Sequence, residues 1–119
     1  MYLIAPMIKQ GEKIIIIKTA ITLRTLLNRN KTLQLAKPNK DIVSSYEKIA
    51  INSSSDLTKA TVNNAFSGVK RSAMTTIVVI IECMGYNLSE FAAEYDKITG
   101  KDISVFEKEV IKAKIKKTS

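Results

Sequence analysis

The sequence predicts an all-α protein, a small bundle of five to six helices forming a single domain over residues 1–119. Three observations predict it. Glycine and proline are scarce, at four and two residues. β-Branched residues recur mostly at helical spacing rather than in strict alternation. The composition is 45% hydrophobic, which is enough to bury a core without disulfides or a structural metal.

The first helix is expected from about residue 12 to residue 28, because apolar side chains recur on one face of that segment. The consecutive isoleucines at residues 14–17 are β-branched, so a short strand is the competing prediction there. Residues 29–40 show no sustained period and contain Pro38, which disfavours helix at the preceding residue. We therefore expect a basic loop over residues 29–40.

The second helix is expected to begin near residue 42 and to end near residue 52. Either Asn39 or Asp41 is expected to open it, because both side chains can cap a helix N-terminus. A polar turn should follow over residues 52–56. The apolar face of this helix is formed by Ile42, Tyr46, Ile49 and Ala50.

The third helix is expected over residues 59–67, with Thr58 as its capping residue and Gly68 as the left-handed residue that ends it. Val62 and Phe66 share its apolar face. Several polar side chains lie off that face and offer hydrogen-bond donors and acceptors: Lys59, Thr61, Asn63 and Asn64. The plain alternative is that they are ordinary surface residues of a helical bundle.

The fourth helix is expected over residues 74–84, with Gly85 closing it. It is apolar nearly all round, which predicts a central, buried helix. Asn87 followed three residues later by Glu90 predicts a capping box at the start of the fifth helix. The apolar stripe of that helix is expected to pack on the fourth helix and consists of Leu88, Phe91, Ala92 and Tyr95.

The sixth helix is expected from residue 102 to about residue 114, with acidic residues leading basic ones as the helix dipole prefers. Residues 114–119 are expected to fray. The helix carries one further apolar stripe, formed by Ile103, Phe106, Val110 and Ala113.

Nineteen Lys and Arg residues against eleven Asp and Glu residues give a formal net charge of +8. The excess is concentrated in residues 1–40, which carry eight bases and one acid, whereas residues 81–119 carry seven of each. This balance favours a polyanionic partner. It is not specific, because ribosome-associated proteins and proteins at membrane surfaces are basic as well.

The single cysteine, Cys83, lies in an apolar run and has no partner for an intramolecular disulfide, so a reducing cytoplasm is the expected compartment. No apolar stretch approaches the roughly 20 residues that span a bilayer. Residues 1–6 are apolar but lack the basic region and cleavage site of a signal peptide. Met7 is an alternative start to Met1.

Enzymatic function is not expected. The chain has no histidine, one apolar-flanked cysteine, no glycine-rich phosphate loop and no carboxylate cluster spaced for a metal. We therefore predict neither a catalytic residue nor a cofactor or metal.

Residues 42–95 resemble the Cro/C1-type, or XRE-like, family of helix-turn-helix DNA-binding proteins, which have a lambda-repressor-like fold. The resemblance is carried by Ala50, Thr58, Val62 and Gly68, and most specifically by the Gly-x-Asn-Leu-x-Glu-Phe sequence within Met84–Phe91. The segment between Ala50 and Thr58 is about two residues longer than the tight turn of that family.

The resemblance implies a helix-turn-helix over residues 42–68 whose recognition helix, residues 58–67, lies in the major groove of duplex DNA. The residues implied to contact bases are Lys59, Thr61, Asn63 and Asn64. The residues implied to contact phosphates are Thr58, Ser67, Lys70 and Arg71.

The function expected from this resemblance is that of a bacterial, cytoplasmic transcriptional regulator that binds a specific operator as a homodimer. The C-terminal helix, residues 102–115, is the expected dimerisation element, because its apolar stripe must be buried somewhere. The alternative is that one compact domain buries this stripe within a single copy. Two alternatives stay open. One is an antitoxin-like or partner-binding protein whose DNA binding is autoregulatory, and the other is a basic structural or RNA-associated helical protein.

Overall fold

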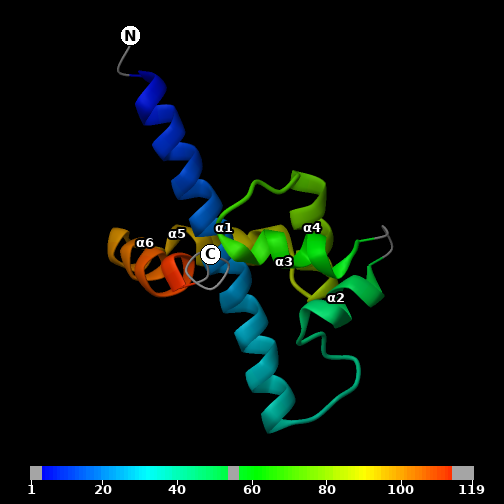
Figure 1. Cartoon of the computed structure of the whole chain (residues 1–119). Helices are drawn as coiled ribbons and strands as arrows, with labels where there is room; N and C mark the ends of the chain where they lie inside the picture. Colours follow the sequence, from blue (N-terminus) through cyan, green and yellow to red (C-terminus); the bar gives the residue numbers. More distant parts are fainter. Residues whose placement is uncertain (1–3, 54–56, 114–119) are drawn as a thin grey trace.

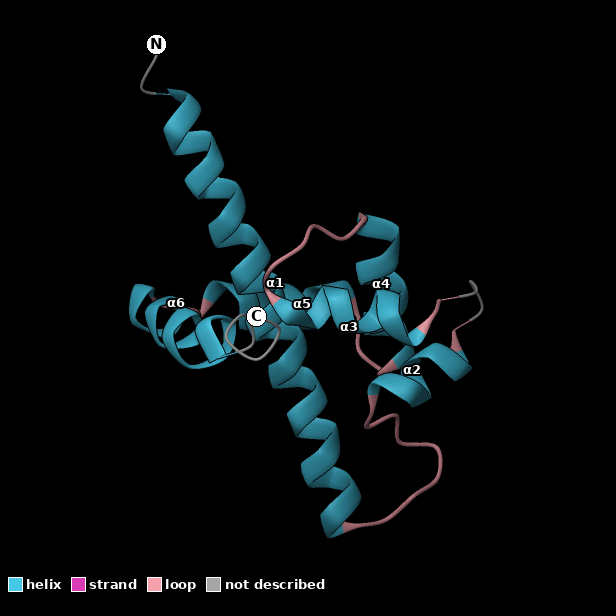
Figure 2. Ribbon diagram, in the orientation of Figure 1, coloured by secondary structure: helices cyan, strands magenta, loops and turns pink. Residues whose placement is uncertain are grey.

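The computed structural model describes the backbone of residues 4–53 and 57–113 and the side chains of residues 11–53 and 57–113. Every regular element in these residues is a helix, as Figures 1 and 2 show. The all-α prediction is confirmed, and residues 14–17 are helical rather than a strand. In chain order the elements are α1 (Ile4–Ala36), α2 (Tyr46–Asn52), α3 (Lys59–Ser67), α4 (Met74–Cys83), α5 (Leu88–Asp96), α6 (Gly100–Phe106) and the π-helical turn η1 (Glu107–Ile111).

Helix α1 is the axis of the molecule. In Figure 1 it crosses the whole structure, with α2, α3 and α4 on one side and α6 on the other. The larger apolar cluster lies between α1 and the first group, and a smaller one lies between α1 and α6. The prediction that the fourth helix is central and buried holds in part: Ile77, Ile80 and Ile81 of α4 lie in the larger core cluster, but Met74 at its start is exposed and α1 is the central helix.

Helix α1 continues to Ala36, so the basic loop predicted over residues 29–40 is helical as far as residue 36. The apolar period is lost at Asn30, the one buried side chain of the last two turns. The Asn30 side-chain amide donates to the carbonyl oxygens of Val43 (2.8 Å) and Met84 (2.9 Å). A buried polar group is tolerated when it is hydrogen-bonded. A helix prediction based on apolar spacing therefore does not recognise Asn30 as a buried position.

Helix α2 begins at Tyr46, later than predicted, and its cap is Ser45 rather than Asn39 or Asp41. The Ser45 hydroxyl accepts from the Lys48 backbone N–H at 3.1 Å. Asn39 instead organises the preceding turn, because its side-chain oxygen accepts from the Asp41 N–H at 2.9 Å. Ile42 therefore lies in the connection and not on the helix face assigned to it.

The predicted starts of the third and fifth helices are confirmed, because both are set by local capping. The Thr58 hydroxyl accepts from the Thr61 N–H at 3.1 Å. Asn87 and Glu90 form the reciprocal capping box. One expectation about α5 is corrected: it packs chiefly against α1 and only secondarily against α4.

The C-terminal helix begins at Gly100, earlier than predicted, because Thr99 and Asp102 form a second capping box. Its apolar stripe is used within the molecule. Phe106 is only 7% exposed and packs with Ile17 and Ala20 of α1. Ile103 and Val110 pack against the same cluster, whereas Ala113 is exposed. The prediction that residues 102–115 form a dimerisation element stays a prediction.

Three sequence predictions fall outside the described residues. They concern the middle of the polar turn, residues 54–56, the start at Met1 and the fraying of residues 114–119. Within the described part of the chain, no single helix is long and apolar enough to cross a bilayer; only α4 and α5 together reach that length, with a bend of 103° between them.

Candidate nucleic-acid interface

Helix α3 is amphipathic, and its two sides have different surroundings. Val62, Ala65 and Phe66 are buried against the rest of the protein. Lys59 and Ala60 are exposed at its start. The outward side is completed by partly exposed polar residues that the sequence had predicted as base contacts: Thr61, Asn63 and Asn64.

Ala60 was missed by the sequence prediction. It lies one helical turn before Asn64, so the two residues are neighbours on the centre of the outward face. Thr61 and Asn63 flank this centre on opposite sides. The helical spacing of 3.6 residues per turn places Ala60 on the outward face of α3. Ala60 was missed because only polar residues were considered as base contacts.

The start of α3 is fixed by two threonines. The hydroxyls of Thr58 and Thr61 lie 2.9 Å apart and share a hydrogen bond, in addition to the bond from the Thr61 backbone to Thr58. Thr58 is exposed. Its hydroxyl is therefore held at the surface at the end of the helix where the dipole favours an anion.

Ser67 does not fit its predicted phosphate contact. It is 4% exposed. Its hydroxyl donates to the Asn64 carbonyl oxygen at 2.8 Å and accepts from the Val69 N–H at 3.2 Å. The side chain closes the last turn of α3, and this prediction is corrected to a structural role.

The C-terminal end of α3 is anchored to α1. Arg24 donates from Nε to the Phe66 carbonyl oxygen at 2.8 Å, and its guanidinium lies 4.9 Å from the Phe106 ring centre. This bond satisfies one of the carbonyls that a helix C-terminus leaves without an intrahelical partner. Phe66 also stacks on Tyr46 of α2, with ring centres 4.6 Å apart. Both contacts fix the direction of α3.

Lys70 and Arg71 follow α3 in an exposed loop. Arg71 forms an ion pair with Glu12 of α1, whereas Lys70 is paired with no carboxylate among the described side chains. The sequence contains no Asp or Glu between Leu57 and Ile81. The local field of α3 and its following loop is therefore positive.

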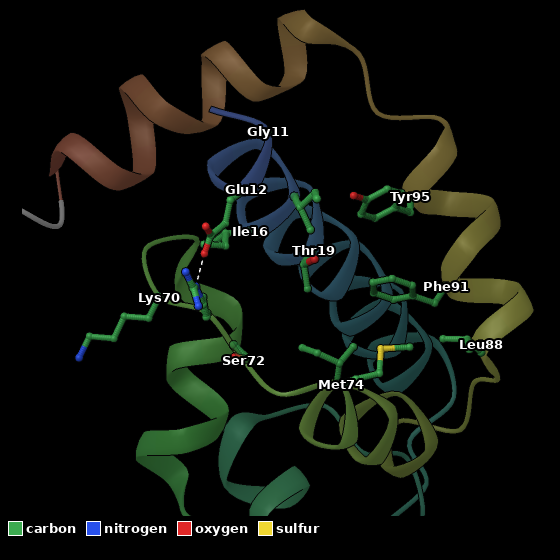
Figure 3. A pocket seen from close by; sticks show the side chains of 14 residues that line it. Gly11, Glu12, Ile16, Thr19, Lys70, Ser72, Met74, Leu88, Phe91 and Tyr95 are labelled. Atoms are coloured by element: carbon green, nitrogen blue, oxygen red, sulfur yellow. Dashed lines mark hydrogen bonds and ion pairs between the residues drawn. The ribbon is translucent and has the colours of Figure 1, made fainter. Parts of the chain in front are cut away.

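A groove of about 810 Å³ lies next to this loop, between α1, α4 and α5 (Figure 3). Its walls are mostly apolar. Glu12 and Arg71 are among its charged lining residues, while Met74, Leu88 and Phe91 line it from α4 and α5.

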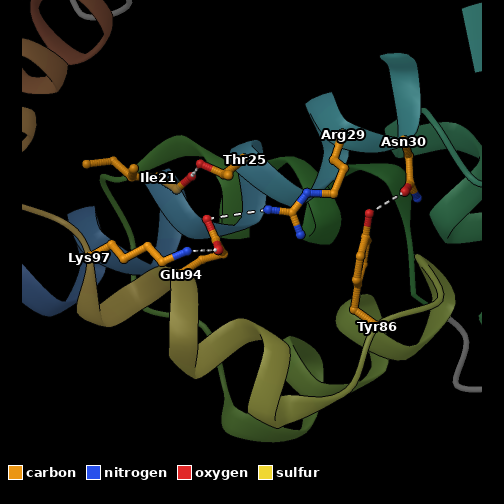
Figure 4. A network of polar contacts seen from close by, with 7 residues as sticks. All are labelled: Ile21, Thr25, Arg29, Asn30, Tyr86, Glu94 and Lys97. Carbon is orange, nitrogen blue, oxygen red and sulfur yellow. Dashed lines mark hydrogen bonds and ion pairs between the residues drawn. The ribbon is translucent and has the colours of Figure 1, made fainter. Parts of the chain in front are cut away.

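Two polar networks hold the α4–α5 unit against α1 (Figure 4). The Tyr86 hydroxyl donates to the Asn30 side-chain oxygen at 2.7 Å. Arg29 pairs with Glu94 at 3.4 Å, and Lys97 donates to the same carboxylate at 2.9 Å. The Lys97 hydrogen bond and the charges of Lys97 and Arg29 lower the pKa of Glu94.

The described side chains contain no group of three or more His, Cys, Asp or Glu that is placed to hold a metal ion. No protein-family model, no curated protein and no solved structure matches the chain.

Proposed function

We propose that the protein binds duplex DNA in a sequence-specific manner, as a transcriptional regulator, through a helix-turn-helix made of α2 and α3. The observation that carries the proposal is the outward face of α3. That face is polar, contains no acidic residue and belongs to a helix whose start is capped by Thr58 and whose C-terminal end is anchored to α1 by the Arg24 bond. A rigid element of this kind suits recognition, since its contacts need no further ordering.

The dimensions and side chains of α3 suit the major groove. Its nine residues give a length of about 14 Å at 1.5 Å per residue, and the major groove is roughly 12 Å wide. Ala60 allows close approach and can contact a thymine methyl group, while Asn64 beside it can bond both polar groups of an adenine. Thus one patch offers the pair of contacts that distinguishes an adenine–thymine step.

The loop after α3 supports the same proposal. Lys70 supplies an exposed cation close to the C-terminal end of the helix, and contacts of this kind to phosphates position a protein on DNA. The charge of Arg71 is partly neutralised by its ion pair with Glu12, so we assign the larger share to Lys70. Thr58 and Lys70 remain proposed phosphate contacts. Lys70 is paired with no carboxylate among the described side chains, and Thr58, whose hydroxyl also caps α3, is exposed.

The proposal is tested by selection from a library of random DNA duplexes, followed by titration of a fluorescent selected duplex. We expect a consensus sequence, and we expect a scrambled duplex of equal length to bind more weakly by a factor of about 10³ or more. Equal affinity for all duplexes, with strong salt dependence, would replace the proposal by non-specific binding. Tighter binding to a structured RNA would favour the RNA-associated alternative.

A partner-binding function is the second candidate, and the groove beside α1 is the observation that favours it. Exposed apolar surface of this kind marks interaction sites in soluble proteins. The antitoxin-like alternative was expected to use the C-terminal helix, and this groove offers a second apolar surface for a different protein.

A further inference from the structure

The groove between α1, α4 and α5 has the size and the walls of a small-molecule site (Figure 3). Its volume of about 810 Å³ falls within the range of roughly 300–1,000 Å³ that ligand pockets occupy. One wall residue from each helix leaves apolar surface open: Ile15 is 55% exposed, Met74 62% and Leu88 46%. Phe91 and Tyr95 add two rings whose centres lie 5.9 Å apart. The groove therefore suits an apolar body.

The polar side chains along this groove are mostly hydrogen-bond donors. Lys70 and Arg71 carry donors and no acceptor, and the hydroxyls of Thr19 and Ser72 can donate as well. Glu12 is the one carboxylate among the described lining residues, and it already accepts from Arg71. A ligand whose polar group is an acceptor complements this set of side chains.

Arg71 can hold such an acceptor while it stays paired with Glu12. The hydrogen bond to Glu12 leaves from Nε, so the two terminal NH2 groups donate to no described side chain. The Arg71 side chain is 79% exposed, and its planar fork of N–H donors matches the geometry of a carboxylate. In Figure 3 the Lys70 side chain extends away from the groove. We therefore assign the contact to Arg71 and a contribution through charge to Lys70.

The charges around the groove favour an anion. Lys18 lies 4.2 Å from the ring centre of Tyr95 at one edge, and Lys70 and Arg71 lie along the groove. These three cations compare with two carboxylates, Glu12 in the ion pair and Asp96 beside Tyr95 in the sequence. The surroundings are thus positive on balance, and an apolar ligand with one negative charge complements them.

We propose that the groove binds a small amphipathic carboxylate, with its apolar body against Met74 and Leu88 and its carboxylate on Arg71. Burial of the apolar body supplies most of the affinity, and the few polar contacts fix the orientation. The body can be an aliphatic chain or an aromatic ring, because both suit these walls. What the two have in common is one carboxylate on an apolar body.

Such a ligand would regulate the proposed function. Lys70 and Arg71 belong to the loop assigned to phosphates, so a bound carboxylate neutralises part of the charge that DNA would use. Ligand and duplex should therefore weaken each other's binding, by the same factor in both directions. This consequence rests on the proposed function, whereas binding in the groove does not.

The first test is calorimetric titration of the full chain with decanoate, below the concentration at which it forms micelles, and with 2-naphthoate. Decanamide and 2-naphthamide are the uncharged controls. We expect at least one carboxylate to bind about tenfold more tightly than its amide, because hydrogen bonds to a charged group are the stronger ones. The tighter of the two carboxylates identifies the body. Equal affinity of acid and amide would overturn the inference. Binding of neither carboxylate would also overturn it and leave the groove to the protein partner of the second candidate function.

The second test places the ligand in the groove. Leu88→Glu should weaken carboxylate binding by about tenfold or more, since a negative charge replaces part of an apolar wall. Leu35→Glu is the matched control, because Leu35 is 86% exposed at the other end of α1. An equal loss in both variants would contradict the site.

Arg71→Gln keeps the proposal testable if Leu88→Glu does not fold, because Arg71 is exposed. It should abolish the preference for acid over amide, and Lys101→Gln on α6 should preserve that preference. A preference that persists in Arg71→Gln would overturn the assigned contact.

The regulatory consequence has a separate readout. A saturating carboxylate should lower the affinity of wild type for its selected duplex, and Arg71→Gln should lose this response. Unchanged DNA affinity in wild type would refute the regulation. A chain that binds the carboxylate but selects no duplex would refute the proposed function alone.

Discussion

Gly68 shows how one residue can be demanded by two separate constraints. Its φ of +78° lies in the left-handed region, where a residue with a side chain pays a strain of roughly 1–2 kcal/mol. A Cβ atom at this position would also lie 2.5 Å from Cε1 of Phe106. The sequence predicted the first constraint from the place of Gly68 after α3. The second depends on Phe106, 38 positions later in the sequence, and was not predictable.

We expect Gly68→Ala to lower the free energy of unfolding by about 2–4 kcal/mol, since the backbone strain adds to the overpacking against Phe106. Chemical denaturation measures the effect. Gly100→Ala is the control, because no atom lies within 4 Å of a Cβ built at Gly100. A loss no larger than that of the control would mean that Phe106 does not pack on this turn.

Asn30 is the residue that made the predicted first helix end too early, because a buried asparagine interrupts the apolar spacing of α1. Its inward position in α1 is occupied by an amide that joins three segments, through Val43, Met84 and Tyr86. A hydrophobic period cannot reveal such a position. The long-range partners that make it favourable become visible only in the folded protein.

Asn30→Ala is expected to destabilise the protein by about 2–4 kcal/mol, because it leaves two buried carbonyl groups and a tyrosine hydroxyl without their partner. Tyr86→Phe should cost only about 1 kcal/mol, since it removes one bond of the three. Thermal unfolding of both variants, with the exposed Asn28→Ala as reference, measures the difference. The reverse order of the two effects would contradict the arrangement of this network.

At the scale of helices, local signals were predictable and tertiary ones were not. The caps at Thr58 and Asn87 were predicted because the hydrogen bonds join residues three positions apart. The packing partner of each helix was not predictable from sequence. Both α5 and α6 pack on α1 rather than on the surfaces predicted for them. At the candidate site, the outward residues of α3 followed from spacing, whereas the Arg24 anchor came from another helix.

The stability of the protein should depend on pH through Glu94, which lies on α5 and contacts Lys97 and Arg29. Its pKa is lowered chiefly by the Lys97 hydrogen bond, so the folded protein favours the ionised carboxylate. The contribution to stability is therefore complete above the ordinary pKa of 4.5 and is lost as the pH falls through the lowered pKa. We expect Glu94→Gln to be less stable than wild type at pH 7, and the difference to shrink below pH 4.5.

Urea denaturation at both pH values measures this effect, with Glu109→Gln as the control because Glu109 is exposed and forms no ion pair among the described side chains. A difference between Glu94→Gln and wild type that stays constant with pH would assign the effect to packing and not to the ionised carboxylate.

The loop after α3 yields a prediction about salt. If Lys70 contacts a phosphate, Lys70→Ala should weaken binding to all duplexes alike and reduce the slope of log affinity against log salt by about 1. Adding Arg71→Ala should reduce it further by less than the first change, because Arg71 is already paired with Glu12. Lys101→Ala on α6 removes the same charge and is the control. An equal loss of slope in that control would indicate a general charge effect.

In the whole molecule, the proposed DNA-binding face of α3 and the apolar groove beside α1 are two distinct surface features. The outward face of α3 is polar and contains no acidic residue, while the apolar groove between α1, α4 and α5 lies on its inner side and is also lined by Lys70 and Arg71 of the following loop. The sequence predicted the apolar stripe of the C-terminal helix but not its place on α1. Phe106 of the stripe predicted for dimerisation is thus buried against α1, whereas the groove between α1, α4 and α5 stays open.

The proposal that side chains of α3 contact base pairs is tested by the base preference of Asn64→Ala. The selected duplex and each of its single-base-pair variants are titrated with wild type, Asn64→Ala and the reference Asn28→Ala. We predict that Asn64→Ala binds the selected duplex more weakly by about 1–3 kcal/mol and loses discrimination at one adenine–thymine pair, with the other preferences retained. Unchanged affinity together with unchanged preference at every position would contradict the account.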